Sequence, residues 1–367
     1  MPERNTMKKI QELQQVKGDA YDYYIAGNED TDLFEKIFLV DDIVEEICKP
    51  DKYFLIGEKG SGKTAYSVYM SKSDKINSFC SISLVENTLY QRFLNMKRQK
   101  ALELSSFKDV WINLIYLILA EKIRKEYGET FFSSIKYKQL SKAIDVFYSD
   151  AFKPEFVNAF EFVDNASASI NSMMKQGLFS TGTKASAETS QKYVEQSFQI
   201  SLLKIRDGFE KAFMSVNLKK PTILFVDGID ARPRDIDNEQ YFECLVGLVN
   251  AVLEMNQSFL KEKQIKIMLL IRPDIMYKMP VHNMNQKLRN NSVLLNWVTS
   301  YRKYIDSKLF KIADDYFMKQ QDYSYELGEC WNYYFPYKVE YQEKWKAPDN
   351  PFVEFLVCIR NPSRIQQ

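Results

Sequence analysis

The octapeptide GEKGSGKT runs from Gly57 to Thr64. It matches the Walker A pattern G-x-x-x-x-G-K-[ST] at every specified position. Its glycines allow the backbone to turn tightly and to approach a phosphate without a clash from a Cβ atom. The backbone N–H groups then point inward, and the start of a helix adds partial positive charge. The octapeptide therefore predicts a phosphate-binding loop.

The side chains of the loop extend this prediction to a nucleoside triphosphate. Lys63 supplies a mobile cation for the β- and γ-phosphates, and the hydroxyl of Thr64 binds Mg²⁺. The alternative is a chance match, but the octapeptide follows a short apolar run and opens a helical pattern, as the motif requires. The predicted nucleotide-binding residues are Gly57, Glu58, Lys59, Gly60, Ser61, Gly62, Lys63, Thr64 and Ala65.

A second apolar run, ILFVD from Ile223 to Asp227, ends in a carboxylate. A strand that ends in this way is the expected partner of a phosphate loop, because its carboxylate holds Mg²⁺ through water. Asp230 follows three residues later and is predicted to orient or deprotonate the attacking water, a role that needs an ionised group at neutral pH. Taken alone, the run equally fits a buried strand that ends in a turn.

A third apolar run, Ile265 to Ile271, is followed directly by Arg272. Ligands of open α/β sheets bind outside the carboxyl ends of the strands, so we predict that this guanidinium reaches the γ-phosphate. The alternative is a surface arginine ahead of a helix that begins with proline. The predicted catalytic residues are Lys63, Asp230 and Arg272, and the predicted metal ligands are Thr64 and Asp227.

Apolar runs alternate with helical patterns along the chain, which indicates an α/β protein with a five-stranded, mostly parallel sheet. The predicted strands are Lys52–Ile56, Asn77–Leu84, Thr222–Val226, Ile265–Ile271 and Ser292–Asn296. The predicted helices are Phe38–Ile47, a helix from Lys63, patterns over about 107–150, 187–215 and 239–258, and Trp297 to about Phe317.

These patterns predict three parts of the chain. Residues 1–32 form a polar, partly helical segment, residues 33–310 form the nucleotide-binding domain, and residues 311–367 form a small aromatic-rich region. A helical insertion over about 100–215 interrupts the second part, and its segment 165–190 is predicted to be a loop or hairpin. The aromatic stretch 316–345 is predicted to be a core, with base stacking as the alternative.

Composition excludes several classes of protein. The 367 residues contain 50 Lys and Arg against 49 Asp and Glu, which argues against a strongly basic, nonspecific nucleic-acid binder. A single His and five scattered Cys make a zinc site or a disulfide framework unexpected. The longest apolar run, Val110 to Ala120, is shorter than the roughly 20 residues that cross a bilayer. We therefore expect a soluble cytoplasmic protein without a membrane partner.

The motifs GEKGSGKT, ILFVDGID and MLLIRPD occur in the order found in P-loop ATPases of the AAA+ and STAND superfamilies. The DGID tetrad resembles the STAND form of the Walker B motif, and the strand that ends in Arg-Pro is similar to the STAND sensor 1. Together with FLVDDIVEEI and SVLLNWVTSYRKYI, these motifs resemble the FunZ-type bacterial P-loop ATPases, relatives of the STAND and KAP NTPases. The resemblance covers about residues 33–85 and 220–310.

The resemblance implies a P-loop NTPase fold of AAA+/STAND type that binds ATP and Mg²⁺. Asp227 would serve Mg²⁺, Asp230 the attacking water and Arg272 the γ-phosphate. It further implies a molecular switch that couples its nucleotide state to homo-oligomerisation or to signalling through a protein partner, with antiphage defence as a plausible setting. The alternatives are a nucleic-acid-stimulated ATPase (a loader or motor) and a nucleotide-dependent scaffold that does not hydrolyse.

Several further residues carry weaker expectations. Phe38, Leu39 and Val40 are candidates for packing near the adenine or, equally, core residues. The chain departs from the family pattern at Ala231 and Ser363, where an acid and an arginine are expected. The candidate arginine fingers are Arg232, Arg234, Arg289 and Arg302, and the substitute lid arginines are Arg360 and Arg364. Because the net charge is close to zero, the basic run NMKRQK (95–100) is expected to be a solvated loop, with contact to nucleic acid as the alternative.

Overall fold

A computed structural model describes residues 12–25, 28–85, 107–128, 137–150, 202–230, 237–279, 284–297, 301–321, 324–338 and 350–360. The chain divides into two compact units. The sheet unit contains Glu46–Lys63 and Asp74–Leu294, and the terminal unit contains Met1–Glu45, Thr64–Ser73 and Leu295–Gln367. The two units are described separately below.

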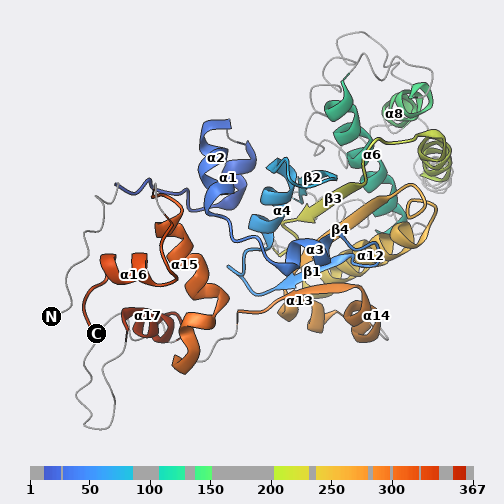
Figure 1. The fold of residues 1–367 in the computed structure, drawn as a ribbon. Helices are drawn as coiled ribbons and strands as arrows, with labels where there is room; N and C mark the ends of the chain where they lie inside the picture. The colour runs from blue at the N-terminus through green and yellow to red at the C-terminus, as the bar shows by residue number, and fades with distance from the viewer. Residues whose placement is uncertain are drawn as a thin grey trace. The chain divides into compact units, whose positions relative to one another are not determined.

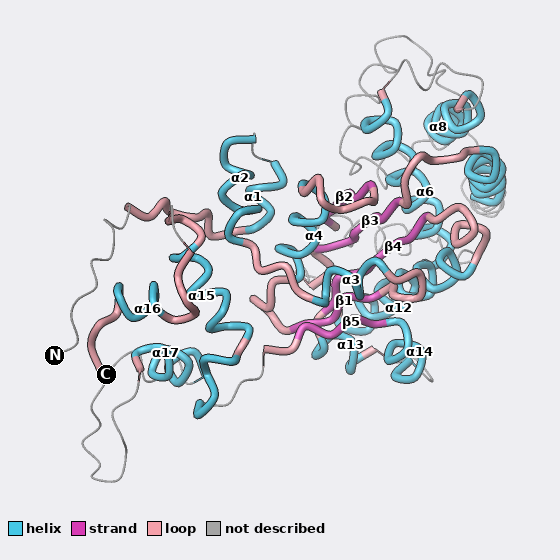
Figure 2. Tube along the Cα trace, viewed as in Figure 1, coloured by secondary structure: helices cyan, strands magenta, loops and turns pink. Residues whose placement is uncertain are grey.

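Five strands form one parallel sheet in the order β2-β3-β4-β1-β5 (Figures 1 and 2). Their bounds are β1 Phe54–Gly57, β2 Phe79–Leu84, β3 Thr222–Asp227, β4 Ile265–Ile271 and β5 Ser292–Leu295. Every residue of β3 and β4 is buried, as expected for parallel strands that are covered on both faces. The predicted α/β class and all five predicted strands are confirmed, and the sheet is parallel throughout.

Helices of the sheet unit cover this core, and α12 (Asn238–Gln257) packs against both β4 and α6 (Phe107–Tyr127) (Figure 1). Gly247 of α12 permits the close approach, because a Cβ atom there would lie 2.6 Å from the Cβ of Phe107. The indole Nε1 of Trp111 donates to the carbonyl of Cys244 at 3.1 Å, which fixes the two helices in register. In the part of this unit that the structure describes, the other helices are α8 Lys138–Asp150, residues 202–215, α13 Pro273–Lys278 and α14 Met284–Asn291.

The terminal unit is helical. Its elements are α1 Ala20–Ile25, α2 Asn28–Ile37, most of α4 (Lys63–Lys72), the 3₁₀ helix η1 Tyr301–Asp306, α15 Lys308–Met318, α16 Glu329–Tyr334 and α17 Pro351–Arg360. Phe38 stacks on Tyr69 of α4 with ring centroids 4.3 Å apart. The hydroxyl of Tyr66, also on α4, donates to Asp41 at 3.0 Å, and Lys308 pairs with the same carboxylate at 2.8 Å. Phe38 and Asp41 therefore hold α4 directly, and Lys308, from a distant segment, fixes Asp41.

A second aromatic cluster lies within the C-terminal helices. Phe310, Trp331 and Phe352 are buried together, with Phe335 packed against them. The buried carboxylate of Asp314 accepts hydrogen bonds from the backbone N–H groups of Gly328 at 2.6 Å and Trp331 at 2.9 Å, which fixes the start of α16. Within the stretch 316–345, Trp331 and Phe335 therefore lie in a core, as we expected, whereas Tyr333 and Tyr337 are about half exposed.

Two predicted helices begin later than expected. Phe38 to Asp41 are not helical, and α3 covers Asp42–Cys48. Trp297 is also not helical, and from Tyr301 onward the predicted helix is divided into η1 and α15. Ser307 separates the two by capping α15, since its Oγ accepts from the backbone N–H of Phe310 at 3.1 Å. Of the helix expected over 187–215, only the part from residue 202 onward is described. None of the described helices is long and apolar enough to cross a membrane.

Candidate functional site

The loop leaves β1 at Gly57 and enters α4 at Lys63. The backbone N–H of Ser61 donates to the carbonyl of Glu58 at 3.1 Å, which closes the turn. Gly60 and Gly62 have φ angles of 78° and 86°, in the left-handed region that side chains other than glycine adopt only with strain. Gly60 and Gly62 are thus required by the shape of the turn itself.

Lys63 is a buried cation in this loop, with 7% of its surface exposed. Its Nζ donates to the carbonyls of Gly57 at 2.8 Å and Glu58 at 3.2 Å. Burial lowers the pKa of the ammonium, while the charges of Asp230 and Asp227 act in the opposite direction and favour the charged form. The cation is therefore held by the loop's own backbone and stabilised by two carboxylates.

Asp227 is the last residue of β3 and is buried. Its Oδ1 accepts from the backbone N–H of Gly228 at 2.7 Å, and its carbonyl accepts from the N–H of Val85 at 2.8 Å. Gly228 has a φ angle of 84°, and a Cβ atom there would lie 3.0 Å from the carbonyl oxygen of Val85. This explains why glycine follows the aspartate, because a larger residue would be strained and would collide with the chain after β2.

Asp230 follows in a turn, with its Oδ1 buried and without a hydrogen-bond partner among the described residues. Burial raises the pKa of this carboxyl to about 6, a shift to which the negative charges of Asp227 and Asp274 add. The positive charges of Lys63 and Arg272 oppose the shift. Such a carboxylate has spare capacity to accept a proton or a hydrogen bond from water.

Arg272 follows β4 directly and forms a bidentate ion pair with Asp274. Its Nε donates to Oδ1 at 2.9 Å and its Nη2 to Oδ2 at 2.8 Å. Our sequence reasoning did not single out Asp274. The spacing Arg-Pro-Asp was the available signal, since an acid two residues after a strand-end arginine can fold back onto it.

The strand order brings these residues to one edge of the sheet. β4 lies between β3 and β1, and Ile56 pairs in register with Ile271. All three strands are parallel, so the loop, Arg272 and Asp227 leave the sheet at its carboxyl edge. The charge of Lys63 accordingly interacts with Asp230, Asp227, Arg272 and Glu58. The structure thus brings together Lys63, Asp227, Asp230 and Arg272, which in the sequence follow three separate strands.

The donor set suits Mg²⁺ bound jointly with phosphates. Among the described residues, no group of three or more His, Cys, Asp or Glu side chains could hold a metal by itself. Mg²⁺ is commonly bound through one or two carboxylates together with substrate phosphates and water. A buried strand-end carboxylate, Asp227, and a hydroxyl next to the loop lysine, Thr64, fit that mode of binding.

The other predicted residues have different outcomes. Thr64 and Ala65 lie in the first turn of α4. Phe38 packs among aromatic rings of the terminal unit, whereas Val40 is 53% exposed. Arg289 is exposed on α14. The positions outside the described residues or side chains are Arg232, Arg234, Arg302, Arg360, Arg364, Ala231, Ser363, the run 95–100 and the segment 165–190.

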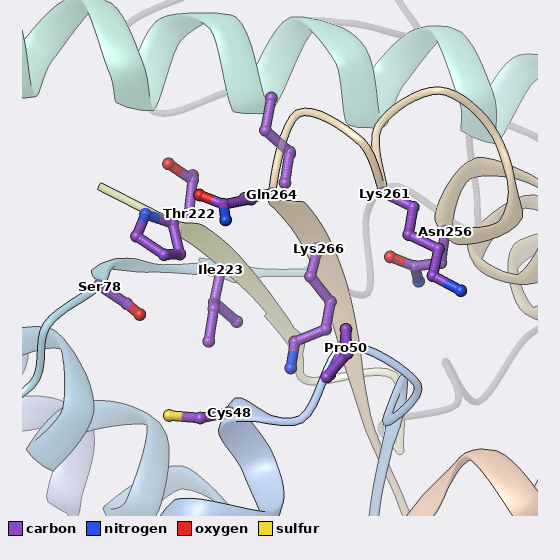
Figure 3. Close-up of a pocket in the computed structure, with 11 residues that line it drawn as sticks. Cys48, Pro50, Ser78, Thr222, Ile223, Asn256, Lys261, Gln264 and Lys266 are labelled. Atoms are coloured by element: carbon purple, nitrogen blue, oxygen red, sulfur yellow. The ribbon is translucent and has the colours of Figure 1, made fainter. Parts of the chain in front are cut away.

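A cavity of about 260 Å³ lies at the opposite, amino edge of the sheet (Figure 3). It is lined by the first residues of β3 and β4, among them Thr222 and Lys266. Lys266 is 7% exposed, and its Nζ donates to the carbonyl of Ile47 and, at 2.8 Å, to that of Lys49. Burial lowers the pKa of this lysine to about 8. Because these carbonyls end helix α3, Lys266 caps that helix.

Comparison with known proteins identifies no relative of this chain. Neither a model of a protein family, nor a curated protein, nor a solved structure matches the chain. Any functional conclusion therefore depends on the residues gathered at the carboxyl edge of the sheet.

Proposed function

We propose that this chain is an ATPase with a P-loop NTPase fold of AAA+/STAND type, and that it binds and hydrolyses ATP with Mg²⁺ as a molecular switch. One observation carries the proposal. The buried ammonium of Lys63, in a loop with the Walker A sequence, interacts electrostatically with Asp227, Asp230 and Arg272 from the ends of neighbouring strands. Cations, a metal-ligand carboxylate and a spare carboxylate are the groups that phosphoryl transfer to water requires.

Each residue has a role in this proposal. The ammonium of Lys63 and the backbone N–H groups of the loop neutralise the phosphates. Thr64 and Asp227 would hold Mg²⁺, which when bound supplies positive charge to the phosphate oxygens. Asp230 orients water through its spare carboxylate oxygen and can accept the proton. Arg272 contacts the γ-phosphate and thereby distinguishes ATP from ADP.

The switch role is supported by the resemblance of the motifs, not by the geometry alone. Loss of the γ-phosphate on hydrolysis would remove the contact of Arg272 and change the state of the protein. The proposal includes a cytoplasmic homo-oligomer that assembles with ATP and signals to a protein partner, in antiviral defence or in another regulatory setting.

Phosphate release by the full chain tests the enzymatic part. We expect turnover of ATP that needs Mg²⁺ and stops when the metal is chelated. Light scattering after size exclusion should show a larger assembly with a slowly hydrolysed ATP analogue than with ADP. Absence of ATP binding in isothermal titration would contradict the proposal. Binding without turnover would favour the scaffold, and DNA-stimulated turnover with a steep salt dependence would favour the loader or motor.

A further inference from the structure

The ion pair of Arg272 and Asp274 uses one particular edge of the guanidinium. The two hydrogen bonds come from Nε and Nη2. A guanidinium carries five N–H donors in a rigid plane, so three remain, two on Nη1 and one on Nη2. One N–H on each Nη forms the end edge of the plane, opposite the side chain's stem, whereas the second N–H of Nη1 points back toward Cδ. Asp274 therefore occupies the side edge of Arg272 and leaves its end edge available for a second anion.

The backbone fixes this arrangement locally. Arg272 is the N-cap of α13 in an extended conformation, with φ −89° and ψ 144°. Pro273 is the first residue of that helix, and its ring holds φ near −65°. The carbonyl of Arg272 also accepts from the backbone N–H of Met276 at 3.1 Å. The backbone between the two residues is thus restrained, which keeps their Cα atoms at a separation that the two side chains can bridge.

The negative charge of Asp274 acts on the charged groups around Arg272. The charge of Arg272 acts on both Lys63 and Asp230, and the charge of Asp274 acts on Asp230, so the pair lies within electrostatic range of these two site residues. Lys63 and Arg272 are like charges, and their repulsion would turn an unpaired guanidinium away from the loop. Asp274 offsets this repulsion. The arginine is only 27% exposed in the pair, and the carboxylate is 43% exposed.

We propose that Asp274 is a positioning residue for ATP recognition. It holds the side edge of Arg272 so that the end edge meets the γ-phosphate, and the preference of the protein for ATP over ADP depends on that orientation. This inference rests on the proposed function and assigns to the same site a residue that sets its selectivity between triphosphate and diphosphate.

The test is a double-mutant cycle on nucleotide preference. Isothermal titration gives the dissociation constants of ADP and of a slowly hydrolysed ATP analogue, each with Mg²⁺. Arg272→Gln should reduce the preference for the triphosphate about tenfold, and Asp274→Asn about three- to fivefold, with ADP affinity unchanged in both. In the Arg272→Gln background, Asp274→Asn should change nothing further. Asp274→Glu, which keeps the charge, should restore most of the preference.

The matched control is Asp145→Asn, which makes the same chemical change at an exposed carboxylate of α8 and should leave the preference unchanged. The inference is overturned if Asp274→Asn keeps the wild-type preference, or if it lowers the preference equally in the Arg272→Gln background. Failure of the wild type to bind either nucleotide overturns the proposed function instead. Thermal unfolding checks each variant, and Asp274→Ser replaces Asp274→Asn if that variant does not fold.

Discussion

Two lysines of the described sheet unit, Lys63 and Lys266, are buried to the same extent at opposite edges of one sheet. Each donates to two backbone carbonyls, and burial lowers the pKa of each. They differ in the charges around them. The carboxylates of Asp230 and Asp227 act on Lys63, whereas the thiols of Cys48 and Cys80 act on Lys266, together with the weaker influence of Asp51.

The difference teaches that burial of a lysine does not by itself mark a functional site. Lys266 fills the end of helix α3, so its hydrogen bonds serve the fold. Lys63 donates to carbonyls of its own loop, which an incoming phosphate can replace at little structural cost. Two nearby carboxylates keep Lys63 charged, as the partner of a phosphate must be.

The largest expected difference between the two lysines is in ATP affinity. Lys63→Ala should raise the dissociation constant of ATP by about 100-fold or more, because it removes the cation that faces the phosphates. Lys266→Met should leave that constant within about twofold, because its side chain lies at the other edge of the sheet. Isothermal titration with Mg²⁺ measures both. A normal affinity in Lys63→Ala would contradict the assignment of the loop.

A second test removes one of the acids that distinguish the surroundings of Lys63. Asp230→Asn should slow hydrolysis by about 10²-fold and keep ATP binding, since the amide cannot accept the proton of the attacking water. Steady-state phosphate release and titration give the two quantities. If turnover equals that of the wild type, another residue must orient the water.

The same substitution should stabilise the protein without nucleotide. The pKa of Asp230 is raised from 3.8 to about 6, so the folded state holds this proton more tightly than the unfolded state does. Its contribution to stability is therefore lost as pH rises from about 4 to about 6. At pH 7, the free energy of unfolding of Asp230→Asn should exceed that of the wild type by about 1 kcal/mol, a value that allows for the partial exposure of the side chain. Urea denaturation measures this gain, and its persistence at pH 4 would contradict the cause given.

The last expected effect is a pH dependence of stability at the structural lysine, away from the nucleotide site. The pKa of Lys266 is lowered from 10.5 to about 8, so the unfolded state binds more protons between these values. The contribution of Lys266 to stability should therefore rise with pH in this window. The unfolding free energy of the wild type, relative to Lys266→Met, should increase by about 2 kcal/mol from pH 7.5 to pH 10. A constant difference would show that the lysine is not held in an apolar setting.

The sheet could be predicted because its signals are local. β4 coincides with the predicted run Ile265–Ile271, and the residues after β1, β3 and β4 supply the charged groups at its carboxyl edge. The role of Lys266 within that run could not be predicted, because its partners Ile47 and Lys49 lie 219 and 217 residues away. The sequence showed a lysine in a buried strand, but not the helix end that accepts its hydrogen bonds.

The site was predictable in composition but not in its internal contacts. The Walker A spacing predicted Lys63, and the ends of the apolar runs predicted Asp227 and Arg272. Only the strand order shows that these three residues lie at the same edge of the sheet. The close approach of Gly228 to Val85 is likewise a contact between distant segments. The pairing of Asp274 with Arg272 is different, since it is local and its spacing was visible in the sequence.

The packing of helix α4 has a practical consequence for anyone who shortens this protein. The loop continues directly into α4, but Tyr66 and Tyr69 of that helix are covered by Phe38 and Asp41, and Asp41 is in turn held by Lys308. A fragment trimmed to residues 46–295 would keep the strands and remove the residues that cover these two tyrosine rings. Exposed aromatic rings promote aggregation. Expression trials should therefore retain the segments that carry Phe38, Asp41 and Lys308, or replace the two tyrosines with polar residues.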